Sequence, residues 1–264
     1  VGDIEGLPFL EAIRQVKKHV GRNDCLYIHV TLVPFVTGAG ELKTKPTQHS
    51  VKELRSLGIQ PDILICRSAQ PIPQDMCEKM AMFCDVDADA VFQNLTARSI
   101  YEVPVLLEKQ GLDEVVLRKL DVDVTNHPLN MDEWHDMVER MLKEYDRKVT
   151  LGVVGKYVEL QDSYISLTEA LRHAAMANEA NLEIKWINAE LAETGEVDLE
   201  AELKGVDAIL VPGGFGDKGL EGKISAIKYA RENKVPFFGI CLGMQCAVVE
   251  YARHIGRADA NTTE

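Results

Sequence analysis

Along most of the chain, short apolar runs alternate with longer segments in which apolar residues recur at helical spacing. The runs Leu26–Val33, Asp62–Cys66 and Ala88–Phe92 are rich in aliphatic residues, as is typical of strands. The segments Pro8–Val20 and Gln74–Phe83 have the spacing of amphipathic helices. Strands that alternate with helices predict a parallel sheet covered by helices, so we predict an α/β fold for this part of the chain.

Polar residues and glycines between the first two of these strands predict a loop over 38–48. Ser50 and Glu53 have the spacing of a capping box, so we predict that a helix begins there and runs to Leu57. A further helix is predicted over 99–110.

The pattern changes over 121–148, where a polar connector precedes one charged helix, Met131–Tyr145. We interpret this segment as an interdomain linker. A second α/β series begins at Val149, with strands predicted to end at Val154, Ile187 and Val211. Helices are predicted over 163–180 and 222–232. The fold class we predict is therefore α/β, with two Rossmann-like parallel-sheet domains, 1–120 and 149–264, joined by a linker helix.

Composition and charge narrow the classes of function. The 264 residues carry a net charge of −13, which argues against general binding to nucleic acid or to a membrane surface. The six cysteines show neither metal-ligand spacing nor a disulfide framework, so a reduced, cytoplasmic location is expected. No apolar run approaches the roughly 18 residues of a membrane span. The first residue is not methionine, and we expect that both ends belong to something longer.

The most informative stretch is 235–245, where an apolar run leads into Gly239-Ile-Cys-Leu-Gly243 and then into a helical pattern. This strand, tight turn and helix have the layout of a nucleophile elbow, with a thiol in place of a hydroxyl. A cysteine at a helix N-terminus is favoured as thiolate, and the amide of Leu242 is placed to bind an oxyanion. The alternative interpretation is a buried structural cysteine in a turn.

A second glycine-rich loop, Pro212–Gly216, follows the predicted strand that ends at Val211. Parallel strands deliver such loops to one edge of a sheet. A thiol and free amides on neighbouring loops suit acyl transfer. These two motifs together resemble a class I glutamine amidotransferase domain.

The segment Lys43–Gln48 places two ammonium groups, two hydroxyls and an amide just ahead of a predicted helix start. Lysines and helix-start amides suit phosphate, although the spacing is not that of a P-loop. Taken alone, the segment is better explained by a solvated lysine-rich loop.

The order of these and other motifs resembles the CTP synthase family over nearly the whole chain, the linker excepted. The motifs are Val1–Glu5, His29–Pro34, Glu41–Leu54, Gly58–Ser68, Ser99–Pro104, Val154–Leu160 and the two amidotransferase loops. The resemblance implies that 1–120 is the C-terminal part of an amidoligase (synthetase) domain and that 149–264 is a truncated amidotransferase domain. It also implies ATP- and Mg²⁺-dependent amination of UTP to CTP, with ammonia from glutamine, activation by GTP, inhibition by CTP, and a homotetramer.

The same resemblance assigns roles to individual residues. Cys241 matches the nucleophile, and Gly213 and Leu242 match the oxyanion amides. The glutamine-binding positions are Gly214, Leu242, Gly243, Met244, Gln245 and Glu264. The UTP- and CTP-binding positions are Asp3, Ile4, Glu5, Lys43, Thr44, Lys45, Pro46, Thr47, Gln48 and Lys79. Residues 215–222 resemble a mobile lid near the GTP site. Ligands for Mg²⁺ and for the ATP phosphates are expected largely outside this chain.

A general base for Cys241 is not visible in the sequence. His254 lies 13 residues further along the same predicted helix, roughly 20 Å away, so it is not expected to reach the thiol. We expect the base beyond Glu264, and the chain as written is expected to turn over glutamine poorly and to make no CTP. Two alternatives are a nucleotide-binding regulatory or assembly fragment without turnover, and a class I amidotransferase that serves another synthetase.

Overall fold

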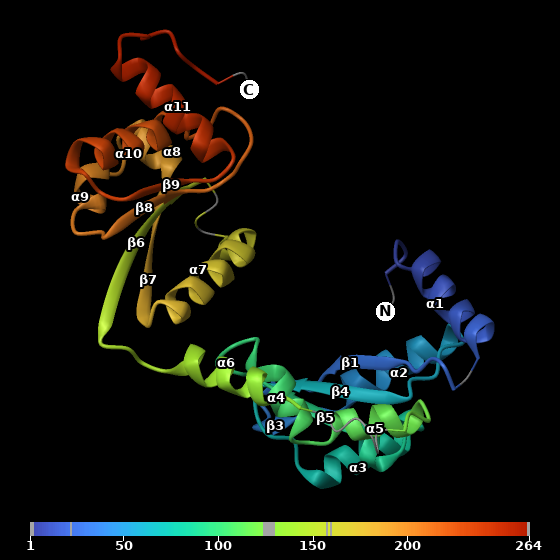
Figure 1. Cartoon of the computed structure of the whole chain (residues 1–264). Coiled ribbons are helices and arrows are strands. Elements are labelled where there is room, and N and C mark those ends of the chain that lie inside the picture. The colour runs from blue at the N-terminus through green and yellow to red at the C-terminus, as the bar shows by residue number, and fades with distance from the viewer. Residues whose placement is uncertain (1–2, 22, 124–129, 157, 159, 263–264) are drawn as a thin grey trace. The chain divides into compact units, whose positions relative to one another are not determined.

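The computed structural model describes residues 3–21, 23–123, 130–156, 158 and 160–262 (Figure 1). The chain divides into two compact units, Val1–Leu142 and Lys143–Glu264. Each is an α/β unit built on a parallel sheet, as predicted. Among the described residues, no helix combines the length and the apolar character that crossing a membrane requires.

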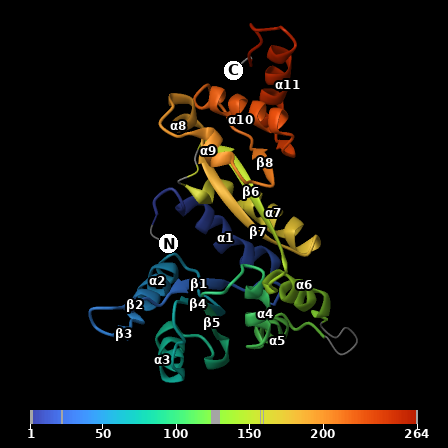
Figure 2. The same cartoon turned by 90° about the vertical axis from the view of Figure 1, so that its left-hand side faces the viewer.

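The first unit contains a three-stranded parallel sheet in the order β1-β4-β5 (Figure 2). Its strands are β1 (Ile28–Leu32), β4 (Ile63–Ser68) and β5 (Val91–Leu95), and a small hairpin of β2 (Phe35–Val36) and β3 (Glu41–Leu42) follows β1. The helices are α1 (Leu7–Val20), α2 (Lys45–Ser56), α3 (Gln74–Cys84), α4 (Glu102–Glu108), α5 (Leu112–Lys119) and α6 (Asp132–Leu142).

Both faces of this sheet are used for packing. On one face, Leu64 and Cys66 of β4 pack with Val51 of α2 and Met80 of α3. On the other, Ile63, Ile65 and Phe92 pack with Val115 of α5. The central strand β4 is therefore buried almost throughout, which is why its sequence is a continuous apolar run.

Three sequence predictions in this unit are corrected. The helix predicted to begin at Ser50 begins at Lys45, because Pro46 in the first turn favours a helix start there. Residues 88–90, predicted as strand, form a 3₁₀ turn, and β5 begins at Val91. The helix predicted over 99–110 is shorter, and α5 follows it as a separate helix.

The helix of the predicted linker packs on the first unit. The indole Nε1 of Trp134 in α6 donates a hydrogen bond of 2.8 Å to the carbonyl oxygen of Tyr101, next to α4. His135 lies 2.9 Å from the carboxylate of Glu108. The predicted linker therefore contributes a packed helix to the first unit, which ends at residue 142. Part of the polar connector before it, 124–129, lies outside the described residues.

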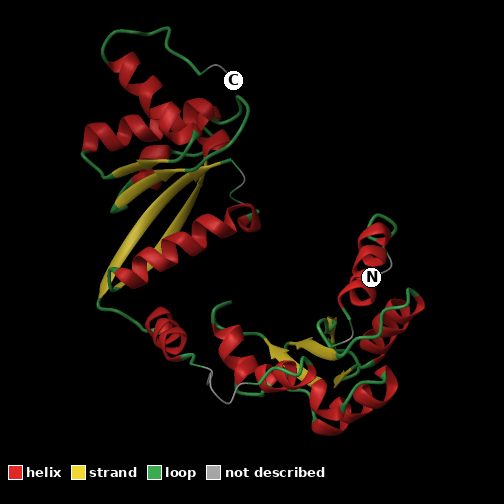
Figure 3. Cartoon of the chain, turned by 45° about the vertical axis from the view of Figure 1, so that its right-hand side comes forward, coloured by secondary structure: helices red, strands yellow, loops and turns green. Residues whose placement is uncertain are grey.

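The second unit contains a four-stranded parallel sheet in the order β7-β6-β8-β9. Strands are drawn in yellow in Figure 3. The strands of this sheet are β6 (Arg147–Gly155), β7 (Ala180–Asn188), β8 (Ala208–Val211) and β9 (Phe237–Gly239). The helices are α7 (Ile165–Ala177), α8 (Ala189–Thr194), α9 (Leu199–Leu203), α10 (Leu220–Asn233) and α11 (Leu242–His254), with a 3₁₀ turn over Gln161–Tyr164.

Helices cover both faces of this sheet as well. Leu167 and Leu171 of α7 pack on one face against Leu151 and Val153. The larger core lies on the other face, where α10 and α11 contribute Ile224, Ile227, Leu242 and Val249 among others. The chain places β7 on one side of β6 and then β8 on the other side, so the order in which strands are added reverses at β6. In such sheets, ligands bind beyond the carboxyl ends of the strands near this reversal.

An ion pair joins α10 to α11. The guanidinium of Arg231 donates to both carboxylate oxygens of Glu250, at 2.8 to 3.1 Å. The Glu250 side chain is 6% exposed and that of Arg231 is 28% exposed. The guanidinium therefore provides the counterion and hydrogen-bond donors for a carboxylate that is almost completely removed from water.

Replacing Arg231 with methionine is expected to lower the free energy of unfolding by about 3 kcal/mol, because Glu250 is left as a buried, unpaired charge. The change is read from urea unfolding. Glu232→Gln is the control, since Glu232 is half exposed and lies 3.5 Å from Arg231, so its loss is expected to cost less than about 0.5 kcal/mol. Equal effects of the two substitutions would contradict the assignment.

Candidate active site

Cys241 lies in a strand–turn–helix at the carboxyl edge of the second sheet. Strand β9 ends at Gly239 and α11 begins at Leu242, so Cys241 is the residue that precedes the helix. Its backbone has φ 50° and ψ −107°, a conformation that residues with a Cβ rarely adopt. The thiol-bearing residue is exposed. The predicted elbow is confirmed in its strand, its turn and its helix.

Two glycines allow the elbow to pack tightly. A Cβ at Gly243 would stand 2.1 Å from the carbonyl oxygen of Val211, at the end of β8. A Cβ at Gly239 would stand 2.6 Å from the carbonyl group of Gly243. Neither contact is physically tolerable, so only glycine lets α11 start against the end of β8.

The glycine-rich loop after β8 lies beside the thiol. The point where a Cβ would stand at Gly213 is 3.5 Å from Cβ of Cys241, and the equivalent point at Gly214 is 3.7 Å from Cδ2 of Leu242. The amide of Leu242 is one of the first N–H groups of α11, which have no acceptor within the helix. The structure thus brings together the residues predicted for the nucleophile and for the oxyanion amides.

The positions predicted to bind glutamine differ in exposure. The side chains of Met244 and Gln245 are exposed, whereas Leu242 and Gly243 are buried. Leu242 and Gly243 are therefore placed to contribute only through their backbone. Glu264 lies outside the described residues.

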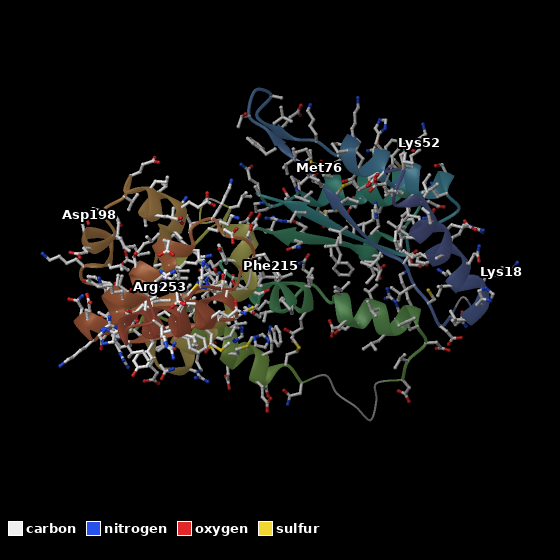
Figure 4. All side chains as sticks on the ribbon, turned by 90° about the horizontal axis from the view of Figure 1, so that it is seen from above. Lys18, Lys52, Met76, Asp198, Phe215 and Arg253 are labelled. Atoms are coloured by element: carbon white, nitrogen blue, oxygen red, sulfur yellow. The ribbon has the colours of Figure 1, made fainter. Side chains whose placement is uncertain are left out.

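The segment predicted as a lid is partly helical. The side chain of Phe215 is 81% exposed and is marked in Figure 4. Gly216 and Gly219 have positive φ values, and α10 begins at Leu220. The non-helical part of this segment is therefore limited to residues 215–219.

The other cysteines have different surroundings. Burial raises the pKa of Cys66 and of Cys84 to about 11, and it raises the pKa of Cys77 and Cys246 as well. All four are buried, and Cys25 has intermediate exposure. Cys246, one turn further along α11, packs in the core of the second unit.

Iodoacetamide at neutral pH is expected to modify Cys241 first, with Cys25 next. A thiol with a pKa near 11 has about a hundredfold less thiolate at pH 7 than an ordinary cysteine, and burial slows its reaction further. Peptide mapping after timed labelling measures the order, and labelling in urea shows that all six thiols are detectable. Modification of Cys66 or Cys246 at the rate of Cys241 would contradict the expected order of reactivity.

The histidine nearest in sequence to the thiol does not reach it. His254 is the last residue of α11, so twelve helical steps place it about 18 Å from Leu242. Among the described residues, no hydrogen bond joins a histidine to Cys241. The prediction that His254 does not reach the thiol is confirmed.

The basic segment of the first unit spans a loop end and the first turn of α2. Lys45 and Pro46 are exposed, and Lys43 forms an ion pair with Glu41. Thr47 is buried, and its hydroxyl donates to the Leu32 carbonyl oxygen at 3.1 Å. The two lysines thus differ: Lys45 is exposed, whereas Lys43 already has a partner.

The two other polar side chains of the segment also have partners. Thr44 is buried, and its hydroxyl oxygen accepts a hydrogen bond of 3.2 Å from the Gln48 side chain. The Thr47 hydroxyl lies 3.0 Å from that of Thr31. In this structure the segment therefore offers lysines and helix-start amides to a ligand, with its hydroxyls turned inward.

The remaining nucleotide positions lie on separate elements. Lys79 is exposed on α3. Asp3, Ile4 and Glu5 are exposed ahead of α1, and Asp3 accepts a hydrogen bond from the amide of Glu5. Among the described residues, no hydrogen bond or ion pair links these positions to the basic segment.

Sequence reasoning missed one residue at the candidate active site. Lys223 in α10 is 2% exposed, and its Nζ lies 3.7 Å from the point where a Cβ would stand at Gly214. The signal was present in the helical pattern, because Lys223 shares a helix face with Leu220 and Ile227, which are both buried.

Comparison with known proteins places these features in a family. The model of the CTP synthase N-terminus matches residues 1–122, and the model of class-I glutamine amidotransferases matches residues 159–263. The first match argues against an amidotransferase that serves a different synthetase.

Relatives match over the whole chain. A CTP synthase of Ruminiclostridium cellulolyticum is 58% identical over 265 residues, covering 100% of this chain and 49% of that protein. A CTP synthase of Methanocaldococcus jannaschii is also 58% identical, over 269 residues and with the same coverage. The chain therefore spans about half the length of the curated relatives it matches.

One solved structure, the glutaminase domain of Trypanosoma brucei CTPS with bound acivicin, is 39% identical and covers 44% of this chain and 45% of that one. Its TM-score of 0.40 is too low to support a statement about the fold. The two family models, in this order along the chain, and the identity of 58% over its whole length lead to one conclusion: the chain belongs to the CTP synthase family.

Proposed function

We propose that this chain carries the glutamine-hydrolysing thiol and part of the pyrimidine-nucleotide site of a CTP synthase. The whole reaction is the ATP-dependent amination of UTP to CTP, with ammonia released from glutamine. The observation that carries the proposal is the exposed Cys241, held at a positive φ between β9 and α11, beside the amide-rich loop at Gly213.

The first step is attack of the Cys241 thiolate on the side-chain carbonyl carbon of glutamine. The carbonyl oxygen takes up the negative charge, and the amides of Gly213 and Leu242 stabilise it. Collapse of this intermediate breaks the carbon–nitrogen bond. The leaving nitrogen takes up the proton that the thiol gave up on ionising, so ammonia leaves and a thioester remains. Water then hydrolyses the thioester to glutamate and frees the thiol.

The proposal is tested by ammonia release from glutamine and by CTP formation from UTP and ATP. Both are measured on a chain that spans the full length of the relatives. Ammonia release with no CTP formation would favour an amidotransferase with another acceptor. Nucleotide binding without either activity would favour a regulatory role.

The basic segment and Lys79 are proposed to bind the phosphates of UTP and CTP. Support comes from the exposed Lys45, which is the first residue of α2 and so lies beside the helix-start amides. Thr44, Thr47 and Gln48 are proposed to shape this site, since their side chains hold one another or β1. Asp3, Ile4, Glu5 and Pro46 complete the proposed set.

Lys45→Ala and Lys79→Ala are each expected to weaken UTP and CTP binding by about 1.5–3 kcal/mol, the usual contribution of a charge-assisted hydrogen bond. Lys43→Ala is expected to have a smaller effect, because Lys43 has to leave Glu41 before it binds phosphate. Calorimetry on the full-length oligomer measures the change. Lys52→Ala, an exposed lysine further along α2, is the control. Unchanged CTP affinity in all of the site variants would refute the assignment.

Family membership also suggests ATP and Mg²⁺ as cofactors, GTP as an activator, and a homotetramer, and we include these in the proposal. Among the described residues, no group of three or more His, Cys, Asp or Glu side chains is placed to hold a metal ion. We therefore assign no Mg²⁺ ligand to this chain. A reducing, cytoplasmic location is proposed from the six unpaired thiols.

A further inference from the structure

Lys223 is an unusual residue in the core of the second unit. It is 2% exposed, and at full burial a lysine normally has a counterion. Among the described residues, its Nζ forms no hydrogen bond and no ion pair. Burial lowers the pKa of Lys223, because the charged form of the amine loses hydration.

The packing of α10 fixes where this ammonium group lies. A Cβ at Gly222 would stand 2.1 Å from the carbonyl oxygen of Ala189, so the start of α10 is held backbone to backbone against α8. Lys223 follows directly and extends to within 3.7 Å of the Cβ point of Gly214. The same point is 3.7 Å from Cδ2 of Leu242, the first residue of α11.

Two sources of positive potential therefore lie close to Gly214. One is the Lys223 ammonium, and the other is the N-terminus of α11, whose helix dipole is positive at this end. The titratable groups that face Lys223 are Cys246 from α11, Lys156 after β6, and Glu190 and Glu193 from α8. None of these forms an ion pair with Lys223, so the positive potential here is not neutralised by a direct contact.

We propose that Lys223 is a positioning residue for the thiol chemistry at Cys241. Its ammonium lies next to Gly214 and favours the negative charge that forms first on sulfur and then on the substrate oxygen. This inference rests on the proposed glutamine-hydrolysing function and adds a residue that acts through the loop. In a poorly hydrated site such a charge acts more strongly than it does in water.

Lys223→Met tests the proposal, because methionine is unbranched, similar in length and uncharged. The rate of Cys241 alkylation by iodoacetamide is measured against pH. The midpoint of the profile is expected to move to higher pH, so that the rate at pH 7 falls about tenfold for a shift of one pH unit. The plateau at high pH, where the thiol is fully ionised, is expected to stay unchanged. A structural change in access to the thiol would alter the plateau instead.

Lys228→Met is the matched control, since Lys228 is an exposed lysine on the same helix and is expected to leave the profile unchanged. Thermal unfolding provides a second readout: Lys223→Met is expected to raise the Tm, because it removes a buried charge without a partner. An unchanged midpoint would overturn the proposal. A Lys223→Met protein that does not fold, while Lys228→Met folds, would also overturn it, because the lysine would then be structural.

Azaserine, a glutamine-like electrophile, separates this proposal from the function on which it rests. Preferential labelling of Cys241 in the unmodified protein supports the glutaminase site whether or not Lys223→Met shifts the alkylation profile. A shift of that profile in a protein whose Cys241 shows no preference for azaserine over iodoacetamide would overturn the assigned role in glutamine hydrolysis.

Discussion

Cys241→Ala is expected to abolish ammonia release from glutamine, with a loss on the order of a millionfold in turnover, as when the nucleophile of a catalytic triad is removed. The amides of Gly213 and Leu242 remain, but they have no tetrahedral intermediate to bind. In a chain of the full length of the relatives, glutamine-dependent CTP formation is expected to be lost together with ammonia release. CTP formation from added ammonia is expected to persist, because that route bypasses the thiol.

Cys246→Ala is the control for this experiment. Cys246 lies on the same helix, but it is fully buried and burial raises its pKa. Its replacement is expected to leave the turnover of glutamine within about threefold of the original value, with a small loss of stability from the lost packing. Persistent glutamine turnover in Cys241→Ala would remove Cys241 from the mechanism, whereas loss of both ammonia- and glutamine-dependent CTP formation would indicate wider structural damage.

The sequence was sufficient to predict the features that depend on the local conformation of the backbone. The elbow was predictable because an apolar run, two glycines and a helical pattern around Cys241 together restrict the backbone to one kind of turn. The parallel sheets were predictable for a similar reason, since strands buried on both faces have continuous apolar runs. The glycine loop at Gly213 could be placed beside Cys241 because parallel strands end at one edge of the sheet.

Features that depend on tertiary contacts were not predictable in the same way. The start of α2 was predicted five residues too late, at Ser50 and not at Lys45, because Pro46 by itself does not show that the first turn is also held by the hydrogen bond from Thr47 to β1. The packing of α6 depends on a hydrogen bond from Trp134 to a distant carbonyl. The apolar neighbours of Lys223 at helical spacing were visible in the sequence, but its burial also depends on the close contact between α10 and α8.

Gly243→Ala is expected to be the most destabilising single change at the elbow. The added Cβ would stand 2.1 Å from the carbonyl oxygen of Val211 and 3.1 Å from the Val211 Cβ. Both neighbours belong to the end of β8, in the middle of the core, so neither side yields without moving α11 away from the sheet. Overpacking of this kind costs about 3 kcal/mol or more. We therefore expect a Tm lower by roughly 9–18 °C for a unit of this size, and a Cys241 that no longer reacts ahead of Cys25.

Gly213→Ala is the matched comparison, because it places the same methyl group at 3.5 Å from Cβ of Cys241, an ordinary contact distance. It is expected to leave the Tm within about 2 °C of the original value, since nothing has to move. It is expected to slow the labelling of Cys241 by azaserine instead, because the added methyl group crowds the thiol. Thermal unfolding and timed labelling of the two variants separate the two roles of glycine here: Gly243 permits the elbow to fold, and Gly213 keeps space for the substrate. A Gly243→Ala protein as stable as Gly213→Ala would mean that α11 does not start against β8 as the structure shows.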